Sequence, residues 1–441
     1  MEEPRYYFAG ESMFAPLKSY WHLRMPGDVS LALNADKAHR SSITGRGVRV
    51  AMVDSGWYKH PYFIGRGYSA APVVLGPAAA NALKDEVGHG TGESANIFAV
   101  APDVDFQPVK MSFVNSVGGF NTAVGLGPDI ITCSWGSSLQ NGPLSAADQT
   151  LAAAIAAAVA SGITVIFSAG NGHFGFPGQH VDVISAGGTF MAPDESLSAS
   201  NYASGFASNI YPGRNVPDVC GLVGMLPKAI YLMLPLEAGD QIDMGNAGLT
   251  HPNGDETVNN DGWAAFSGTS AAAPQLAGVA ALVKQACPAL TPAEVKAILM
   301  KSARDVTTGT CNAATGGNAA TVGPDLATGT GLVDAHKATL LAKVKCLGPI
   351  TVRPPIAVRP PITVRPPITV QPPITVRPPI TPILPPIKPV EPIVPIKPIA
   401  PVIAAGEAET AEASAAREPA RLTERDVEHL SDMIMKSELD L

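Results

Sequence analysis

Short, almost wholly apolar segments alternate with helix-forming segments through most of this chain, and this alternation constrains the fold more than any other feature. Strands are predicted at residues 48–53, 105–110, 130–133, 163–168 and 183–186, and helices at 145–160 and 271–285. Strands that are apolar on both faces are typical of parallel sheets covered by helices on each side. The pattern predicts a doubly wound, mostly parallel α/β sheet, in which ligands bind at the carboxyl edge of the strands.

A further helix is predicted after Thr291. Thr291 is a typical N-cap, Pro292 suits the first helical position, and Glu294 completes a capping box. Val295, Ile298 and Leu299 are then expected to face the core. Because 46% of the 441 residues are hydrophobic and only 15% are charged, the chain can form a sizeable core.

Three polar residues lie at the edges of the predicted elements. Asp54 directly follows the strand at 48–53, His89 lies between two glycines, and Ser270 follows Gly268-Thr269 at a helix start. Backbone N–H groups at such a start stabilise developing negative charge. The serine becomes a nucleophile when a histidine takes its proton and an aspartate orients the imidazole. Each motif alone is more common in ordinary turns, so their joint occurrence carries the argument.

Together these motifs resemble those of the subtilisin-like serine proteases, the subtilases. The order Asp54, His89, Ser270 is the family order, and Asp-Ser-Gly, His-Gly-Thr and Gly-Thr-Ser-Ala-Ala-Ala-Pro are family-type motifs. The resemblance covers roughly residues 33–342. It implies a serine endopeptidase that hydrolyses polypeptide substrates through an acyl-enzyme intermediate.

The resemblance also implies roles for residues around the three motifs. Asn171 would stabilise the oxyanion together with the backbone N–H of Ser270. The segment Ser134-Trp135-Gly136 would pair with substrate and, with Ala169 and Gly170, line the S1 region. Neither of these two segments contains an acid, which predicts a small or apolar P1 side chain.

The segment 225–262 is long and acidic. Hard oxygen ligands of this kind can bind calcium, but their spacing matches no calcium loop, so we expect a solvated loop. No cofactor is expected to be required, and no metal-ligand set is predicted. Among the acids that the segment carries are Asp240, Asp243, Asp255, Glu256 and Asp261.

The five cysteines show no metal-binding spacing, and we expect most of them to be reduced. In an oxidising compartment a Cys287–Cys311 bridge is one possible pairing, and the sequence does not decide whether it forms. Residues 1–8 begin acidic and hold no long apolar run, which argues against a secretory signal. The apolar stretch 151–169 predicts a helix followed by a strand rather than a membrane span. We therefore expect a cytoplasmic protein, with non-classical export as the alternative.

The composition changes abruptly after residue 346. Residues 347–405 hold 19 of the 41 prolines and repeat Val-Arg-Pro-Pro-Ile-Thr with period six, which predicts a polyproline II spacer. Residues 406–441 carry ten acids against four bases, and an amphipathic helix predicted at 422–436 would dock on a protein partner. The expected divisions are an N-terminal extension (1–32), a peptidase domain (33–346), a linker (347–405) and an acidic tail (406–441).

Two classes of function follow from these features. The first is an active serine endopeptidase. The second is a protease-like binding or scaffolding protein that acts through its tail. The net charge of −8 argues against nucleic acid as a partner. The three motifs and Asn171 favour the enzyme.

Overall fold

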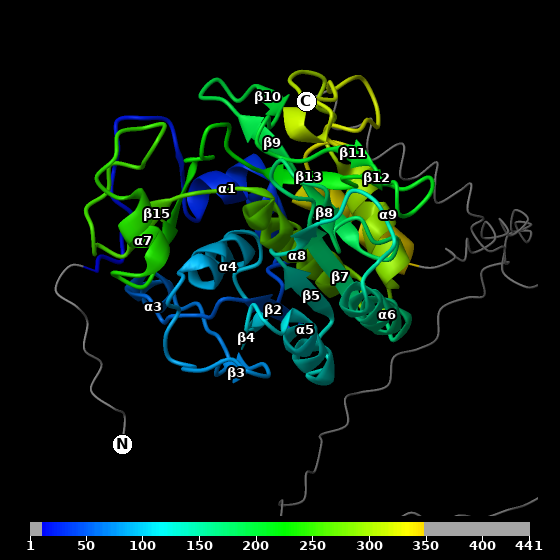
Figure 1. Ribbon diagram of the computed structural model, residues 1–441, viewed down its shortest axis with the longest axis horizontal. Coiled ribbons are helices and arrows are strands. Elements are labelled where there is room, and N and C mark those ends of the chain that lie inside the picture. Colours follow the sequence, from blue (N-terminus) through cyan, green and yellow to red (C-terminus); the bar gives the residue numbers. More distant parts are fainter. Residues whose placement is uncertain (1–10, 348–441) are drawn as a thin grey trace, which may run out of the picture. The chain divides into compact units, whose positions relative to one another are not determined.

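The computed structural model describes residues 11–347 (Figure 1). The proline-rich linker from residue 348 on and the acidic tail, including the helix predicted at 422–436, lie outside the described residues. Within the described part, a helix long and apolar enough to cross a membrane is absent.

The main sheet has eight strands, and its order is β10-β9-β7-β5-β2-β4-β3, with β13 pairing to β9 as well. All neighbours are parallel except β10, which runs antiparallel to β9. The predicted mostly parallel sheet is thus confirmed. The strands are β2 (Arg49–Asp54), β3 (Val74–Leu75), β4 (Asp105–Lys110), β5 (Ile130–Cys133), β7 (Thr164–Ser168), β9 (Ile184–Met191), β10 (Leu197–Ala199) and β13 (Val219–Leu222).

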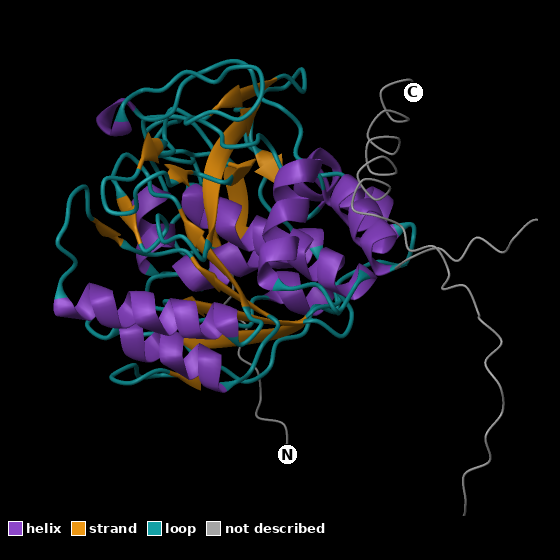
Figure 2. Ribbon diagram, turned by 90° about the vertical axis from the view of Figure 1, so that its right-hand side faces the viewer, coloured by secondary structure: helices purple, strands orange, loops and turns teal. Residues whose placement is uncertain are grey.

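Helices cover both faces of this sheet, so two apolar cores form (Figures 1 and 2). Successive residues of a strand point to opposite faces, and in β2 Val50 and Met52 enter one core while Ala51 and Val53 enter the other. The first core holds α1 (Gly27–Ala32), α2 (Ala35–His39), α4 (His89–Val100), α8 (Thr269–Ala286), α9 (Pro292–Ser302) and α10 (Ala335–Cys346). The second core holds α5 (Ser116–Gly125) and α6 (Ala146–Ala160).

Helix starts follow the capping chemistry of the sequence. Ser145 caps α6, and Thr291 and Glu294 form the predicted capping box at the start of α9. Val295, Ile298 and Leu299 are buried, as expected.

Small elements surround the main sheet. They are α3 (Pro61–Gly65), α7 (Gln241–Asn246) and a 3₁₀ turn (Ala313–Thr315), with a sheet of β1 (Leu23–Arg24), β14 (Leu232–Pro235) and β15 (Trp263–Ala265). Two strand pairs join β6 (Ser137–Ser138) to β8 (Gly175–Phe176) and β11 (Phe206–Ala207) to β12 (Asn215–Val216). Leu23 and Val29 are fully buried in the first core, so the folded unit includes residues before the boundary expected at residue 33.

The segment 225–262 differs from the solvated loop expected from its acidic sequence. It contributes β14 and α7, and four of its acids are buried: Glu237, Asp240, Asp243 and Asp255. Asp255 accepts hydrogen bonds from the backbone N–H groups of Thr257 and Ala265 at 3.0 and 2.8 Å. These carboxyls bind the chain's own N–H donors, which a sequence pattern does not reveal.

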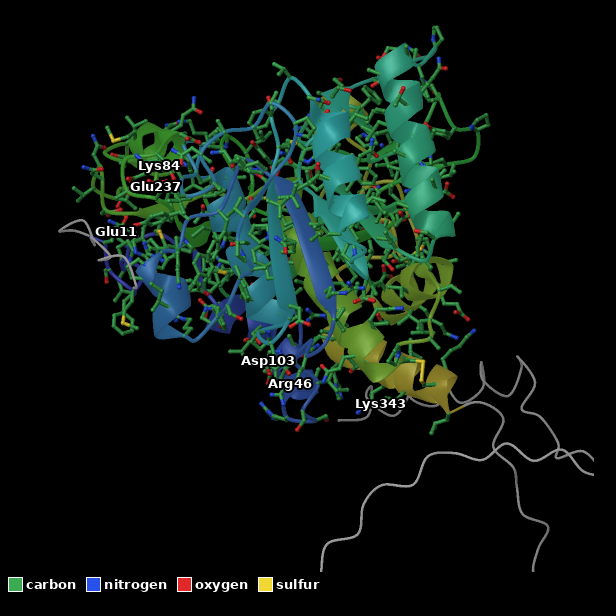
Figure 3. The ribbon with its side chains drawn as sticks, turned by 90° about the horizontal axis from the view of Figure 1, so that it is seen from below. Glu11, Arg46, Lys84, Asp103, Glu237 and Lys343 are labelled. Carbon is green, nitrogen blue, oxygen red and sulfur yellow. A yellow bond between two sulfur atoms is a disulfide. The ribbon has the colours of Figure 1, made fainter. Side chains whose placement is uncertain are left out.

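The disulfide of the structure also differs from the one considered from the sequence. Cys287 pairs with Cys346, which joins the end of α8 to the end of α10 (Figure 3). Cys311 is a buried free thiol that packs in a separate small cluster. A Cys287–Cys311 bridge is therefore wrong, because helix packing brings together two cysteines that are 59 residues apart in the sequence.

Candidate active site

Asp54 and His89 meet at the carboxyl edge of the main sheet. Asp54 is the last residue of β2, and His89 is the first residue of α4. The Nδ1 atom of His89 lies 2.7 Å from Asp54 Oδ1, which also accepts a hydrogen bond from the N–H of Ser55 at 2.7 Å. Because a carboxylate only accepts, Nδ1 carries the hydrogen and Nε2 of the neutral ring is left to accept a proton.

The start of α4 is held by Asp85, which the sequence did not single out, and by residues of the motifs around Asp54 and His89. Gly88 adopts φ +86° before the helix, a conformation that favours glycine. The Asp85 carboxylate accepts from the N–H of Gly88 at 3.1 Å and from the N–H and hydroxyl of Thr91 at 2.8 and 2.7 Å. Ser55 Oγ accepts from the N–H of Gly90 at 2.8 Å. These bonds fix the backbone that carries His89.

The surroundings of His89 favour its charged form. Burial lowers the pKa of its imidazole, but the charge and hydrogen bond of Asp54 outweigh burial. With smaller contributions from Glu93 and Asp85, they raise the pKa to about 9. The ring is 24% exposed, so solvent remains in contact with one side of it. A proton taken up by His89 is therefore well stabilised.

Ser270 is the second residue of α8 and is half-buried. Its hydroxyl donates to the carbonyl oxygen of Ser134 at 3.3 Å, and the Ser134 hydroxyl donates to the carbonyl oxygen of Ser270 at 2.7 Å. This reciprocal pair ties the start of α8 to the end of β5. Within residues 11–347, the hydroxyl of Ser270 is not hydrogen-bonded to His89; catalytic hydrogen bonds often tighten only with substrate bound.

Asn171 contacts Thr269, the residue before this serine. Its Oδ1 atom accepts from the backbone N–H of Thr269 at 2.9 Å and from the Thr269 hydroxyl at 3.0 Å. The Nδ2 end of the amide is thereby left to donate. A Cβ at Gly268 would lie 2.8 Å from Nδ2, so the backbone must be glycine there for the amide to fit. Thr269, for which the sequence predicted no role of its own, orients Asn171.

The expected substrate-binding residues lie at the ends of β5 and β7. Ser134 is buried, and Gly136 is exposed. Trp135 donates its indole N–H to the Val53 carbonyl oxygen at 2.8 Å and packs edge-on against Phe167, so part of its apolar surface is used inside the protein. Ala169 and Gly170 are buried.

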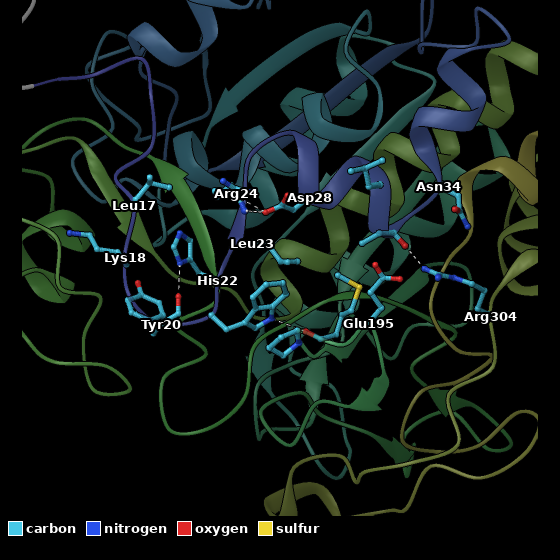
Figure 4. Close-up of a pocket in the computed structure, with 15 residues that line it drawn as sticks. Leu17, Lys18, Tyr20, His22, Leu23, Arg24, Asp28, Asn34, Glu195 and Arg304 are labelled. Atoms are coloured by element: carbon cyan, nitrogen blue, oxygen red, sulfur yellow. Dashed lines mark hydrogen bonds and ion pairs between the residues drawn. The ribbon is translucent and has the colours of Figure 1, made fainter.

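A well-formed pocket of the described surface lies away from these residues. It has a volume of about 520 Å³, and none of its lining residues belongs to the predicted site (Figure 4). Residues 17–24 form much of its wall, and the Trp21 indole donates to the Met191 carbonyl oxygen at 3.1 Å. The candidate active site is therefore a surface edge, assembled at the carboxyl ends of β2, β5 and β7, rather than this pocket.

A metal centre is not apparent in the described part of the chain, where no group of three or more His, Cys, Asp or Glu side chains could hold an ion. Subtilases typically act without a cofactor, although calcium binding is common among them.

Comparison with protein families identifies this architecture. The model of the subtilase family matches residues 45–321, more than half of the chain. The chain belongs to the subtilase family. The family consists of serine-type endopeptidases, which confirms the resemblance and the fold class expected from the sequence.

Individual relatives are alkaline proteases and subtilisins. Alkaline elastase YaB of Bacillus sp. (strain YaB) is 29% identical over 293 residues, which are 62% of this chain and 64% of the relative. M-protease of Shouchella clausii is 28% identical over 326 residues, 70% of this chain and 68% of the relative. Subtilisin Savinase of Lederbergia lenta is 26% identical over 290 residues, which are 62% of this chain and 88% of the relative. The chain thus spans slightly less than two thirds of the length of the elastase.

These relatives also correct the expected location. They are secreted, extracellular proteases and point to a secreted protein, so the cytoplasmic location expected from the sequence is wrong. That expectation depended on the composition of residues 1–8, which carries no information about the family. The Cys287–Cys346 disulfide agrees with the correction, because disulfides are typical of oxidising compartments.

Proposed function

We propose that this subtilase is an active serine endopeptidase with Ser270 as nucleophile, His89 as base and acid, and Asp54 as the residue that orients His89. The observation that carries the proposal is the 2.7 Å contact between His89 Nδ1 and Asp54 Oδ1 at the sheet edge that also bears Ser270. A serine hydroxyl is a weak nucleophile until an adjacent base accepts its proton.

The proposed reaction has two halves. Ser270 Oγ attacks the substrate carbonyl carbon while its proton passes to His89 Nε2, and the tetrahedral intermediate collapses as His89 returns that proton to the leaving amine. Water then attacks the acyl-enzyme, with His89 again accepting and returning a proton, and the carboxylic acid product leaves. Asp54 stays ionised and stabilises the imidazolium formed in each half.

We further propose that Asn171 and the backbone N–H of Ser270 stabilise the oxyanion. Support comes from the two hydrogen bonds by which Thr269 holds Asn171 Oδ1, since they turn the Nδ2 donor away from Thr269. The N–H of Ser270 belongs to the first turn of α8, where N–H groups lack partners within the helix. Donors fixed in advance in this way do not have to reorganise as the charge develops.

For the substrate, we propose polypeptides with a small or apolar P1 side chain. The segments Ser134–Gly136 and Ala169–Gly170 contain no acid that would attract Lys or Arg. The name of one relative, alkaline elastase YaB, agrees with such a preference. A dominant Lys or Arg preference in a peptide library would contradict this part of the proposal.

The test is covalent labelling combined with kinetics. A fluorophosphonate should modify Ser270 in the wild-type protein, and Ser270→Ala should abolish both labelling and peptide hydrolysis. Asn171→Ala should keep the label but lower kcat by roughly 10²–10³, with little change in KM. A wild-type protein that is folded but neither labelled nor active would contradict the proposed endopeptidase activity and favour the binding or scaffolding alternative.

A further inference from the structure

A buried acid lies one helical turn after His89. Glu93 is fully buried, and residues four apart on a helix lie on the same face. Its carboxyl group is close enough to His89 and Asp54 for their charges to act on it. Burying an unpaired carboxylate in an apolar core is costly, so the position of Glu93 requires an explanation that packing alone does not supply.

One carboxyl oxygen of Glu93 begins a chain of buried amides. Asn96 Nδ2 donates to Glu93 Oε2 at 2.8 Å, and Gln275 Nε2 donates to Asn96 Oδ1 at 2.9 Å. The backbone N–H of Leu222 donates to Gln275 Oε1 at 2.7 Å. Because the three side chains are fully buried, the chain is shielded from water. It joins α4, which carries His89, to α8, which carries Ser270, and to β13.

The other carboxyl oxygen of Glu93 is buried without a hydrogen-bond partner among the described residues. Among the described residues, neither Glu93 Oε1 nor Asp54 Oδ2 has a hydrogen-bond partner, and both atoms are buried. Two neighbouring carboxyl groups in a dry site do not both ionise readily. Burial is the largest influence on the pKa of Glu93 and raises it. The charge of His89 lowers this pKa and the charge of Asp54 raises it, so that the pKa of Glu93 is about 8.

Other charges around Glu93 are distant or already paired. The elements packed against α4 are α8, β2, β14 and α1. Lys284 on α8 donates to the carbonyl oxygens of Pro288 and Leu290, and Asp28 on α1 pairs with Arg24. Arg49 lies at the opposite end of β2 from Asp54, and β14 has no ionisable side chain. Asp85 contributes to the raised pKa of His89, and burial together with the charge of Asp54 raises the pKa of the Cys133 thiol, which leaves it neutral.

We propose that Glu93 is a positioning residue that holds a proton behind the Asp54–His89 pair and, through Asn96 and Gln275, fixes the spacing of the helices that carry His89 and Ser270. This inference rests on the proposed function. Once Glu93 ionises, near pH 8, its negative charge stabilises the imidazolium of His89, so the imidazole releases its proton only at higher pH. If the proton moves from Glu93 to His89, the imidazolium is stabilised and the base is lost.

The proposed proton on Glu93 can be detected without measuring enzymatic activity. In the Ser270→Ala background at pH 7, the infrared spectrum should contain bands of buried protonated carboxyl groups, and Glu93→Gln should remove the one that belongs to Glu93 while leaving that of Asp240. The Glu93 band should disappear from the unsubstituted background as the pH rises past about 8. If Glu93→Gln leaves the acid bands unchanged, Glu93 is ionised and the proposal is overturned.

The positioning role is tested by kinetics with Ser270 intact. Glu93→Gln keeps a neutral group that can still accept from Asn96, so kcat should stay close to wild type, and the rise of kcat with pH should move to lower pH. Glu93→Leu and Gln275→Leu break the amide chain and should each lower kcat by roughly 10- to 100-fold without a matching change in KM.

A matched control and a measure of folding complete the experiment. Glu11→Gln removes another partly buried carboxyl group of raised pKa, which bonds Tyr58 and the Ala238 N–H, and should leave kcat and its pH dependence unchanged. Urea unfolding shows whether each variant is folded. Equal kcat in wild type, Glu93→Leu and Gln275→Leu would refute the positioning role. The fluorophosphonate label on wild type reports separately on the proposed function.

Discussion

Asp54 and Asp218 are both buried carboxylates at strand ends, but they have different partners. Asp218 lies just before β13, and its two carboxylate oxygens accept hydrogen bonds from the two terminal nitrogens of the Arg214 guanidinium. It also lies 3.0 Å from Lys296 Nζ and accepts a hydrogen bond from the N–H of Ser185 at 2.8 Å. Among the described residues Asp54 has a single ion-pair partner, His89. Arginine stays charged at all relevant pH values, whereas histidine gains and loses its proton near neutrality.

The pKa shifts of the two sites express this difference. Burial raises the pKa of Asp218, but Arg214 and Lys296 outweigh it and hold that pKa below its ordinary value. Burial also lowers the pKa of Lys296 despite Asp218, so we take Arg214, which bonds both carboxylate oxygens, as the dominant partner. The charge of Asp218 thus serves structure, while that of Asp54 acts on a proton that can move.

The largest effect is expected from Asp54→Asn. It should lower kcat by about 10⁴, because an asparagine neither fixes the reactive tautomer of His89 nor stabilises the imidazolium. The pKa of His89 should fall from about 9, since Asp54 is its main raising influence, so the residual activity should rise at lower pH than in wild type. Peptide hydrolysis and NMR titration of the histidine check both points. A loss of stability in place of the loss of kcat would assign Asp54 a structural role like that of Asp218.

Asp218→Asn should have the opposite consequence. Removing one partner leaves the Arg214 guanidinium buried without its counter-charge, which should lower the free energy of unfolding by about 3–5 kcal/mol. The folded fraction should keep near-normal kcat. Urea unfolding in the Ser270→Ala background avoids self-cleavage. Because the pKa of Asp218 is depressed on folding, its contribution is present above about pH 4 and is lost as the pH falls through the folded-state pKa. A variant as stable as wild type at pH 7 would contradict the comparison.

The sequence predicted the elements whose pattern is local. β4 and β5 match their predicted bounds, and α6 and α9 begin at the predicted caps. β9 extends to Met191, five residues beyond its prediction, because Gly187 and Gly188 weaken the apolar pattern while pairing with β13 and β10 supports the strand.

The candidate site could be proposed from the sequence only where its residues lie in short motifs. Those motifs placed Asp54, His89, Asn171 and Ser270 at the edges of elements, and the structure gathers them at one edge of the sheet. The residues that support them were not predictable. Gln275 and Asn96, for example, are 179 residues apart, and each is an unremarkable helical amide until the two helices pack together.

The smallest effect is expected from a substitution at Asp240, a third buried carboxyl group. Asp54 and Asp218 each face a cationic or basic partner, whereas Asp240 faces other acids. Burial, with Asp85 and Asp243, raises its pKa to about 8, although the backbone N–H of Asp243 donates to it. Asp240→Asn keeps a side-chain oxygen that can cap α7 but removes the charge. The folded state holds a proton on Asp240 that the unfolded state releases above about pH 4.

The contribution of Asp240 to stability is therefore complete below about pH 4 and falls as the pH rises through about 8. Asparagine has no such proton to lose. Across this pH range the free energy of unfolding of Asp240→Asn should therefore rise relative to that of the parent protein. At pH 9 the variant should be more stable by about 1–3 kcal/mol, which is the cost of burying an unsatisfied polar group. Urea unfolding at pH 5, 7 and 9 in the Ser270→Ala background measures the difference. If the gain is the same at all three pH values, it comes from packing, and the Asp240 carboxyl does not titrate as its acidic surroundings require.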